Sequence, residues 1–297
     1  MSPVASTYRT TPGFFYLDRD DTRRRAALLM LALEAKSPRA KSFGVSFARA
    51  LAKIGKASLN TTGKPRIATE GSMFQLARLR GMIDDSVKPS SYGIEARVLA
   101  RRSVQHALIF LGLQHPPLSE LCDLLITDIL VWPSDQSGGG SISSLPGVAW
   151  LVPADRLTTL DIAESVIHEM VHMNLHLADM TVGLYTRLPG TDFEAYSAVR
   201  GRRRRYHHAF HSACVAVTIL YYRMLLGLGD DLSALRESLH RCTAELMGHP
   251  DAFTRYAWCA IRAAHAFSRA PRLSAIPVHR DLMTLSRTRS RQQASGS

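Results

Sequence analysis

The chain has few cysteines and no long hydrophobic run. Its 297 residues include four cysteines, which are far apart and form no C-x-x-C pair: Cys122, Cys214, Cys242 and Cys259. This spacing argues against a disulfide framework and against a thiolate zinc site. The first apolar run, from Ala26 to Leu33, is too short to span a bilayer, and no small-residue cleavage pattern follows it. We therefore expect a cytoplasmic protein without a membrane partner.

Acidic residues are also scarce relative to basic ones. The chain has 37 Lys and Arg against 25 Asp and Glu, which gives a net charge of +12. A positive charge favours anionic partners, such as nucleic acid, an acidic peptide or a carboxylate cosubstrate. Arginines are concentrated at residues 23–25, 202–205 and 287–291. No RNA- or DNA-binding motif accompanies them, so nucleic acid is not an expected partner.

Helical periodicity dominates the sequence. From Thr22 to Leu113 apolar residues recur at three- and four-residue spacing, and a second helical stretch begins at Thr158, which forms a capping-box pattern with Asp161. Between these stretches, "LLITDILVW" and "GVAWLV" predict two strands that could pair as an edge hairpin. The triple glycine between them predicts a flexible loop, because no Gly-Lys-Ser/Thr of a phosphate-binding loop follows it. The expected fold class is mainly α with a small antiparallel β-hairpin (α+β).

The segment "ESVIHEMVHMNLHLAD", from Glu164 to Asp179, contains the strongest chemical signal. His168 and His172 are four residues apart, which places both imidazoles on one face of a helix, about one turn apart. Glu169 is rotated to one side, where it could act on a metal-bound water. The surrounding residues are apolar, and burying two imidazoles and a carboxylate there would be costly without a bound partner. The sequence therefore predicts a metal site on this helix.

The residue types alone leave the third ligand open. His176 lies eight residues from His168, roughly 12 Å along the helix axis, so we expect it to pack beside the site and not to bind the same ion. A metzincin protease is excluded, because Leu175 and Ala178 stand where that family has its glycine and its third histidine. A gluzincin peptidase would instead use a downstream glutamate. The possible third ligands are His207, His208, His211, Glu194 and Asp192.

Three motifs between Val166 and Leu225 carry a resemblance to a known family. "VIHEMVH" is followed by "YSAVR" and then by "AFHSA", with Tyr196, Ser197, Val199 and Arg200 in the second motif and Phe210, His211 and Ser212 in the third. This arrangement resembles the HExxH-motif peptide modification family. Its members are fused to or encoded beside peptide-maturation enzymes and act as iron(II)/2-oxoglutarate-dependent HExxH-type peptide β-hydroxylases. The run of arginines at 202–205 replaces the proline-flanked arginine of that family, and the first 110 or so residues show no resemblance.

The resemblance implies an oxygenase of natural-product peptide maturation that uses iron(II), 2-oxoglutarate and O2. His168, His172 and His211 would hold the iron, and Glu169 would be a nearby acid or hydrogen-bonding residue. Three imidazoles with open coordination positions suit iron(II) on chemical grounds. Arginine binds carboxylates bidentately, so the cosubstrate is expected to bind near Arg200 or Arg204, and the family match adds Tyr196. The substrate would be a peptide or an amino-acid side chain, for example in a leader-bearing precursor peptide.

A zinc-dependent HExxH metallopeptidase, with Glu169 as general base, is the alternative prediction. In either case we expect residues 1–21 to be a flexible N-terminus and residues 271–297 to be a basic flexible tail. Residues 22–270 are expected to form a single mainly helical catalytic domain. Within it, residues 22–113 would be a helical N-terminal part, with a possible role in leader-peptide recognition, and residues 114–270 the metal-binding part.

Overall fold

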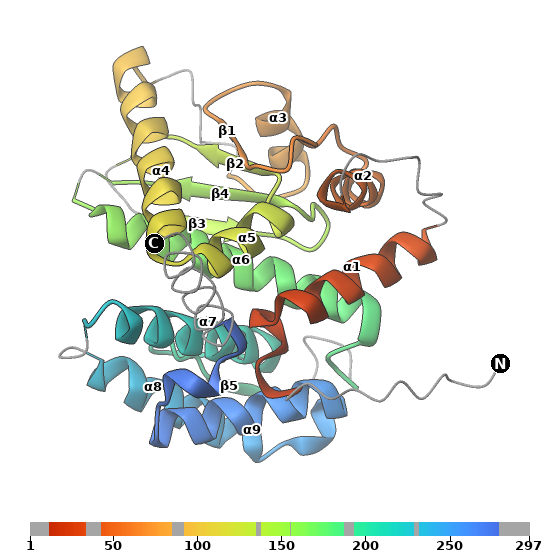
Figure 1. Ribbon diagram of the computed structural model, residues 1–297, viewed down its shortest axis with the longest axis vertical. Helices are drawn as coiled ribbons and strands as arrows, with labels where there is room; N and C mark the ends of the chain where they lie inside the picture. The colour runs from red at the N-terminus through yellow and green to blue at the C-terminus, as the bar shows by residue number, and fades with distance from the viewer. Residues whose placement is uncertain are drawn as a thin grey trace, which may run out of the picture.

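The computed structural model describes residues 12–33, 43–84, 92–134, 138–154, 156–186, 193–228 and 232–278. A helix-covered sheet and a group of C-terminal helices lie on either side of one long helix, α6 (Thr159–Val182), as Figure 1 shows. The other α-helices are α1 (Arg19–Ala32), α2 (Phe43–Gly55), α3 (Ser72–Leu79), α4 (Ile94–Gln114), α5 (Pro116–Leu125), α7 (Tyr206–Leu225), α8 (Ser233–Met247) and α9 (Arg255–Arg269). The predicted fold class, mainly α with a small β component, is confirmed.

Six strands form two small sheets in the described residues. They are β1 (Arg66–Ala68), β2 (Asp128–Val131), β3 (Gly138–Ser141), β4 (Val148–Val152), β5 (Glu194–Tyr196) and β6 (Arg203–Arg205). The first four form a sheet of order β1-β2-β4-β3, and β5 pairs with β6 as a small antiparallel hairpin. Part of the arginine run at 202–205 is therefore strand and not loop.

The predicted hairpin between the two apolar strands is wrong. β2 and β4 are neighbours, but they run parallel, with Asp128 opposite Val148 and Val131 opposite Leu151. The antiparallel partner of β4 is β3, which contains the triple glycine that we expected to be a flexible loop. Both expectations failed because they treated the segment between the two apolar strands as a connection, whereas it supplies a strand of its own.

The glycines of β3 allow a tryptophan to lie across the strand. A Cβ added at Gly140 would be 2.7 Å from Nε1 of Trp150, and one at Gly138 would be 3.1 Å from the same ring. The register explains this contact, because Gly140 pairs directly with Trp150 of β4. A side chain at either position would displace the indole. The glycines therefore permit close packing of the edge strand and do not mark a loop.

Both chain ends are more ordered than predicted within the described residues. A 3₁₀-helix, η1 (Pro12–Leu17), falls in the expected flexible N-terminus, and its Tyr16 and Leu17 are fully buried. Near the other end, η5 (Leu273–Ala275) is followed by the buried side chains of Ile276 and Val278. Apolar burial against the C-terminal helices explains this order. The predictions for residues 1–11 and 279–297 lie outside the described residues.

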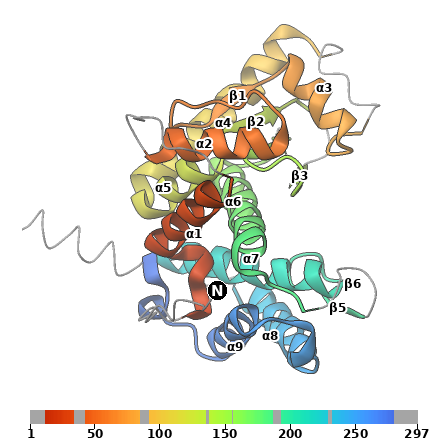
Figure 2. The same ribbon diagram turned by 90° about the vertical axis from the view of Figure 1, so that its right-hand side faces the viewer.

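Helix α6 is the central element. It begins with the predicted capping box, in which the backbone N–H of Asp161 donates to Oγ1 of Thr158 (3.2 Å) and the backbone N–H of Thr158 donates to the Asp161 carboxylate (2.8 Å). One of its faces is buried against α1, α4 and α5, and α7 lies alongside it (Figure 2). Among the described residues, no helix has the length and apolar character needed to cross a membrane.

The N-terminal helix supports α6 through a buried polar network. The Arg25 guanidinium donates to the carboxylate of Asp21 (2.9 Å) and to the backbone carbonyl of Asn174 (3.2 Å) in the middle of α6. The Asn174 side-chain amide donates in turn to the carbonyl of Tyr16 (2.8 Å). These buried groups are costly to separate, because each would lose its partner away from water. Residues 15–25 therefore help to fix the position of α6.

Candidate functional site

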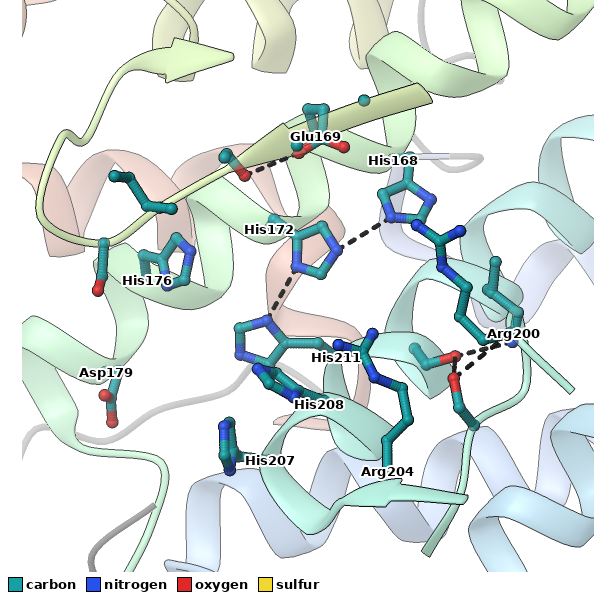
Figure 3. A pocket seen from close by; sticks show the side chains of 18 of the residues that line it. His168, Glu169, His172, His176, Asp179, Arg200, Arg204, His207, His208 and His211 are labelled. Atoms are coloured by element: carbon teal, nitrogen blue, oxygen red, sulfur yellow. Dashed lines mark hydrogen bonds between the residues drawn. The ribbon is translucent and has the colours of Figure 1, made fainter. Parts of the chain in front are cut away.

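A cavity of about 490 Å³ lies between α6, α7, the edge strand β3 and the turn that follows β5. Helix α6 contributes five polar side chains to its lining: His168, Glu169, His172, His176 and Asp179. Helix α7 contributes His207, His208, His211 and Ser212, and the turn after β5 contributes Ser197, Val199 and Arg200. All three motifs that carry the family resemblance therefore meet in one cavity, as Figure 3 shows.

Three histidines are linked through their ring nitrogens. Nε2 of His172 is 3.0 Å from Nε2 of His168, and Nδ1 of His172 is 2.9 Å from Nδ1 of His211 (Figure 3). A neutral imidazole carries one N–H and one lone pair, so His172 can donate to one neighbour and accept from the other. The contacts require no charged ring, and the three residues predicted to be ligands lie together.

Burial keeps these histidines neutral. It lowers the pKa of His168 to about 4, with a further contribution from the charge of Arg200. Burial also lowers the pKa of His172 and of His211 well below the ordinary value, and the neighbouring histidines add to this effect. Metal ions bind the neutral imidazole, so the site presents the required form at neutral pH.

The donor types and their pairwise spacing fit a transition metal. Neighbouring nitrogen ligands of one ion are roughly 3 Å apart, close to both observed N···N distances. Among the described residues, however, no group of three His, Cys, Asp or Glu side chains is already arranged to hold an ion. His172 meets His168 and His211 through different nitrogens, so binding by all three requires its ring to turn until one nitrogen faces both partners.

His176 lies in the same histidine cluster. Its ring centroid is 5.4 Å from that of His211 and 6.4 Å from that of His172, and burial lowers its pKa to about 4. His176 is separated from His168 by about two turns of α6, as the spacing predicted. His211 of α7, however, lies about equally far from His172 and from His176. His176 is therefore a neighbour of the proposed third ligand.

Glu169 is turned toward the edge strand. Its side chain is 3% exposed and accepts a hydrogen bond from Oγ of Ser141 (2.7 Å). A Cβ at Gly139 would be 3.4 Å from its carboxylate, so β3 lies directly against it. Burial raises the pKa of Glu169 to about 7, while the Ser141 bond and the charge of Arg200 act in the opposite direction. A carboxyl group with this pKa can hold or release a proton near neutral pH.

Two arginines supply positive charge to the cavity. Arg200 and Arg204 both line it, and Figure 3 shows the Arg200 side chain extending toward His168 and the Arg204 side chain toward His211. Neither makes an ion pair with another described residue. Burial, followed by the nearby charges of Arg200 and Arg202, lowers the pKa of Arg204, so a bound anion would stabilise its charged form. The pair is therefore suited to a carboxylate ligand.

A serine network holds the turn that carries Arg200. Oγ of Ser197 donates to Oγ of Ser212 (2.9 Å), and the backbone N–H of Val199 also donates to Oγ of Ser212 (2.8 Å). Because Ser212 follows His211 directly on α7, this network links the arginine-bearing turn to the histidine-bearing helix. The second and third family motifs are thus joined by hydrogen bonds.

Two residues considered in the sequence do not belong to the cavity. Tyr196 lies on β5, where the Arg241 guanidinium stacks over its ring at 4.1 Å, and it is not among the lining residues, so its role in cosubstrate binding stays a prediction. Glu194, the carboxylate that a gluzincin would need, is exposed on the same strand and does not line the cavity. Asp192 lies outside the described residues.

Several of the lining residues carry no signal in the sequence that would select them. Ser141 was missed because its strand was taken as a loop, although it forms the hydrogen bond to Glu169. Tyr185 was missed because it follows the motif helix in an irregular segment. Oη of Tyr185 and Nδ1 of His207 are buried in the lining without a hydrogen-bond partner among the described residues. Such atoms are costly unless water or a ligand meets them, which supports a polar occupant of this cavity.

Comparison with known proteins adds no assignment. No protein-family model matches the chain, and no curated protein matches it. The family resemblance therefore rests on the three motifs and remains a prediction. The geometry of the cavity is the basis for the function proposed below.

Proposed function

We propose that the protein is an iron(II)/2-oxoglutarate-dependent oxygenase that hydroxylates an unactivated carbon of a peptide or amino-acid side chain. One observation carries the proposal: a cavity combines three neutral histidines, of which His211 is buried and the other two are partly buried, with two arginines that have no ion-pair partner among the described residues. The histidines are suitable ligands for iron(II), and the arginines are suitable partners for a dicarboxylate. The β-carbon as the position of hydroxylation follows from the family resemblance alone.

His168, His172 and His211 would hold the metal, leaving coordination positions toward the cavity. Iron(II) with 2-oxoglutarate and dioxygen supplies the oxidising power for hydroxylation and releases succinate and carbon dioxide. The chain itself orients the participants. Burial keeps the three imidazoles neutral, so they bind a cation without first losing a proton.

Arg200 and Arg204 would bind the carboxylate of 2-oxoglutarate that is distant from the metal. Arg200 is the stronger candidate, because the serine network fixes its turn against α7 close to His168. A guanidinium can bind a carboxylate bidentately, which sets both the position and the orientation of the cosubstrate. Glu169, bonded to Ser141, would hold a hydrogen-bonding proton beside the metal ligands.

A zinc metallopeptidase is the second candidate function, favoured by one observation. The pKa of Glu169 is raised to about 7, which suits a general base that takes a proton from a metal-bound water. Against it, Glu194 lies outside the cavity, so the additional carboxylate ligand of a gluzincin is missing from the described lining. We therefore prefer the oxygenase.

The proposal is tested by purifying the protein without oxygen, adding iron(II) and 2-oxoglutarate, and recording the absorption spectrum before admitting oxygen. We expect a metal-to-ligand charge-transfer band and then succinate formation. His211→Ala should abolish both, whereas His106→Ala, which changes an exposed histidine of α4, should abolish neither. The absence of the band and of succinate would refute the oxygenase. Zinc-dependent peptide cleavage that is lost in Glu169→Gln would establish the peptidase instead.

A further inference from the structure

A second cavity, of about 360 Å³, adjoins the first at the metal helix. His168 and Val199 line both cavities. The first extends from His168 along α6 toward Asp179, and the second extends in the opposite direction toward Asp161. His168, a proposed metal ligand, therefore stands at the junction between two hollows that follow one helix.

Four of the residues that line the second cavity are aliphatic, and the others are polar or charged. Val215 and Ile219 of α7, Leu235 of α8 and Val199 of the connecting turn line it. Val199 is 40% exposed, and it lines the first cavity as well as the second. An aliphatic side chain left open to solvent beside a candidate active centre is suited to cover by an apolar part of a ligand.

The charged groups of this second cavity already have partners. The Arg223 guanidinium binds the Glu164 carboxylate through two bonds of 2.6 and 2.8 Å. The Asp161 carboxylate accepts from the backbone and side chain of Thr158 in the capping box. Since these charges are satisfied within the chain, the cavity favours an apolar group and offers little to an ion.

The combined length of the two cavities exceeds that of a single amino acid. Their lining residues on α6 recur every three or four positions from Asp161 to Asp179, so they share one face of the helix. Eighteen residues of α-helix rise about 27 Å. An extended polypeptide advances about 3.3 Å per residue, so roughly eight residues would span this distance.

We propose that the two cavities bind an extended peptide segment along α6, with one aliphatic side chain of the peptide in the hollow lined by Val199, Val215, Ile219 and Leu235. This assignment rests on the proposed function in that it names the substrate class of the same site: a peptide with Val, Leu or Ile close to the residue presented to His168. A free amino acid would leave most of the lining uncovered.

The test is a selection of displayed random octapeptides on the immobilised full chain, with Leu235→Trp selected in parallel. We expect peptides with Val, Leu or Ile at one fixed position. Leu235 is half-buried at the mouth of the cavity, so the indole can fill the hollow from its rim. The preferred residue should then change to Gly, Ala or Ser. For a selected octapeptide, replacing the aliphatic residue by Gly should weaken binding to the native chain about tenfold or more.

Two further variants make the result interpretable. Leu113→Trp, at a residue of α4 that is 76% exposed, adds the same indole away from the cavity and should leave the aliphatic preference unchanged. Val199→Ser removes part of the aliphatic wall from a half-exposed position and should weaken the preference without filling the hollow. Thermal melting of each variant checks that it folds.

Three results would overturn the assignment: no enriched peptide, enrichment without an aliphatic position, or an aliphatic preference that persists in both Leu235→Trp and Val199→Ser. The selection needs neither oxygen nor turnover, so it is independent of the succinate assay. A clear aliphatic preference in a protein that forms no succinate would uphold the cavity and reject the oxygenase. Succinate formation without an aliphatic preference would uphold the oxygenase and reject the peptide assignment of the two cavities.

Discussion

Two histidine groups of this protein differ in what their ring nitrogens contact. On α8 and α9, His240 and His265 stack with ring centroids 4.7 Å apart, and each bonds to a hydroxyl: Nδ1 of His240 to Ser268 (3.2 Å) and Nδ1 of His265 to Thr243 (3.1 Å). In the cavity, by contrast, both ring nitrogens of His172 contact other histidines, His211 at 2.9 Å and His168 at 3.0 Å.

The comparison shows that two neighbouring histidines do not by themselves make a binding site. The pair on α8 and α9 has hydroxyl partners from its own helices and lines neither of the two cavities. His168, His172 and His211 come from separate helices, are partly or fully buried, and use one another as partners, an arrangement that a metal ion can replace without leaving a hydroxyl unsatisfied.

Replacing His172, which contacts both other proposed ligands, should give the largest difference in activity between the two histidine groups. We expect His172→Ala to abolish the iron–oxoglutarate band and to lower succinate formation at least a hundredfold, because the residue contacts both other proposed ligands. His240→Ala should change neither by more than about twofold, since surface substitutions away from a site are usually mild. Equal losses in both variants would show that the cavity is not the metal site.

The arginine prediction uses two residues of the same basic segment. Arg200→Ala should raise the KM for 2-oxoglutarate roughly 10- to 100-fold, the effect expected for losing charge-assisted bonds to a carboxylate. Arg203→Ala is the matched control, because that guanidinium binds Glu245 at 3.0 Å on the outer side of the β5–β6 hairpin. Its removal should alter the KM by less than about twofold. Steady-state kinetics of succinate formation measures both KM values. A similar rise of the KM in both variants would contradict this expectation.

The pH dependence of stability should also differ between buried and exposed histidines. Burial lowers the folded-state pKa of His176 from 6.5 to about 4, so between these values the unfolded chain binds more protons. The free energy of unfolding of the metal-free protein should therefore fall as the pH falls from 6.5 to 4. In His176→Phe this fall should be smaller by about 2 kcal/mol, and in His106→Phe it should be unchanged. Denaturant unfolding at several pH values measures both slopes, and identical slopes would contradict the assigned burial effect.

The smallest expected effect concerns the bond between β3 and Glu169. The hydroxyl of Ser141 lowers the pKa of Glu169, so Ser141→Ala should raise that pKa further above its ordinary value. Because Glu169 is proposed to hold a proton beside the metal ligands, the basic limb of the kcat/KM profile should move to higher pH by less than about one unit. Ser144→Ala changes an exposed serine that does not line the cavity and should leave the profile in place. A shift to lower pH in Ser141→Ala would be inconsistent with this account.

Local patterns predicted the elements whose signals lie close together in the sequence. The capping box at Thr158 and the apolar periodicity around His168 defined α6, and both are present in the structure. The edge strand was missed because its glycines, read locally, are typical of a loop. Only the position of Trp150 on the neighbouring strand explains why side chains are absent there. Tyr196 does not line the cavity, because a motif indicates which residues lie near a site and not the direction of each side chain.

From the sequence, helical periodicity and residue chemistry predicted two histidine ligands one helical turn apart but left the third ligand open. The family resemblance added a third histidine in a later motif and an arginine between them. The tertiary structure alone brought His211 within 2.9 Å of His172, placed Ser141 against Glu169, and opened the aliphatic cavity beyond His168. These contacts join residues 28 to 39 positions apart, and the packing of α6, α7 and β3 decides them because no local pattern encodes which surfaces meet.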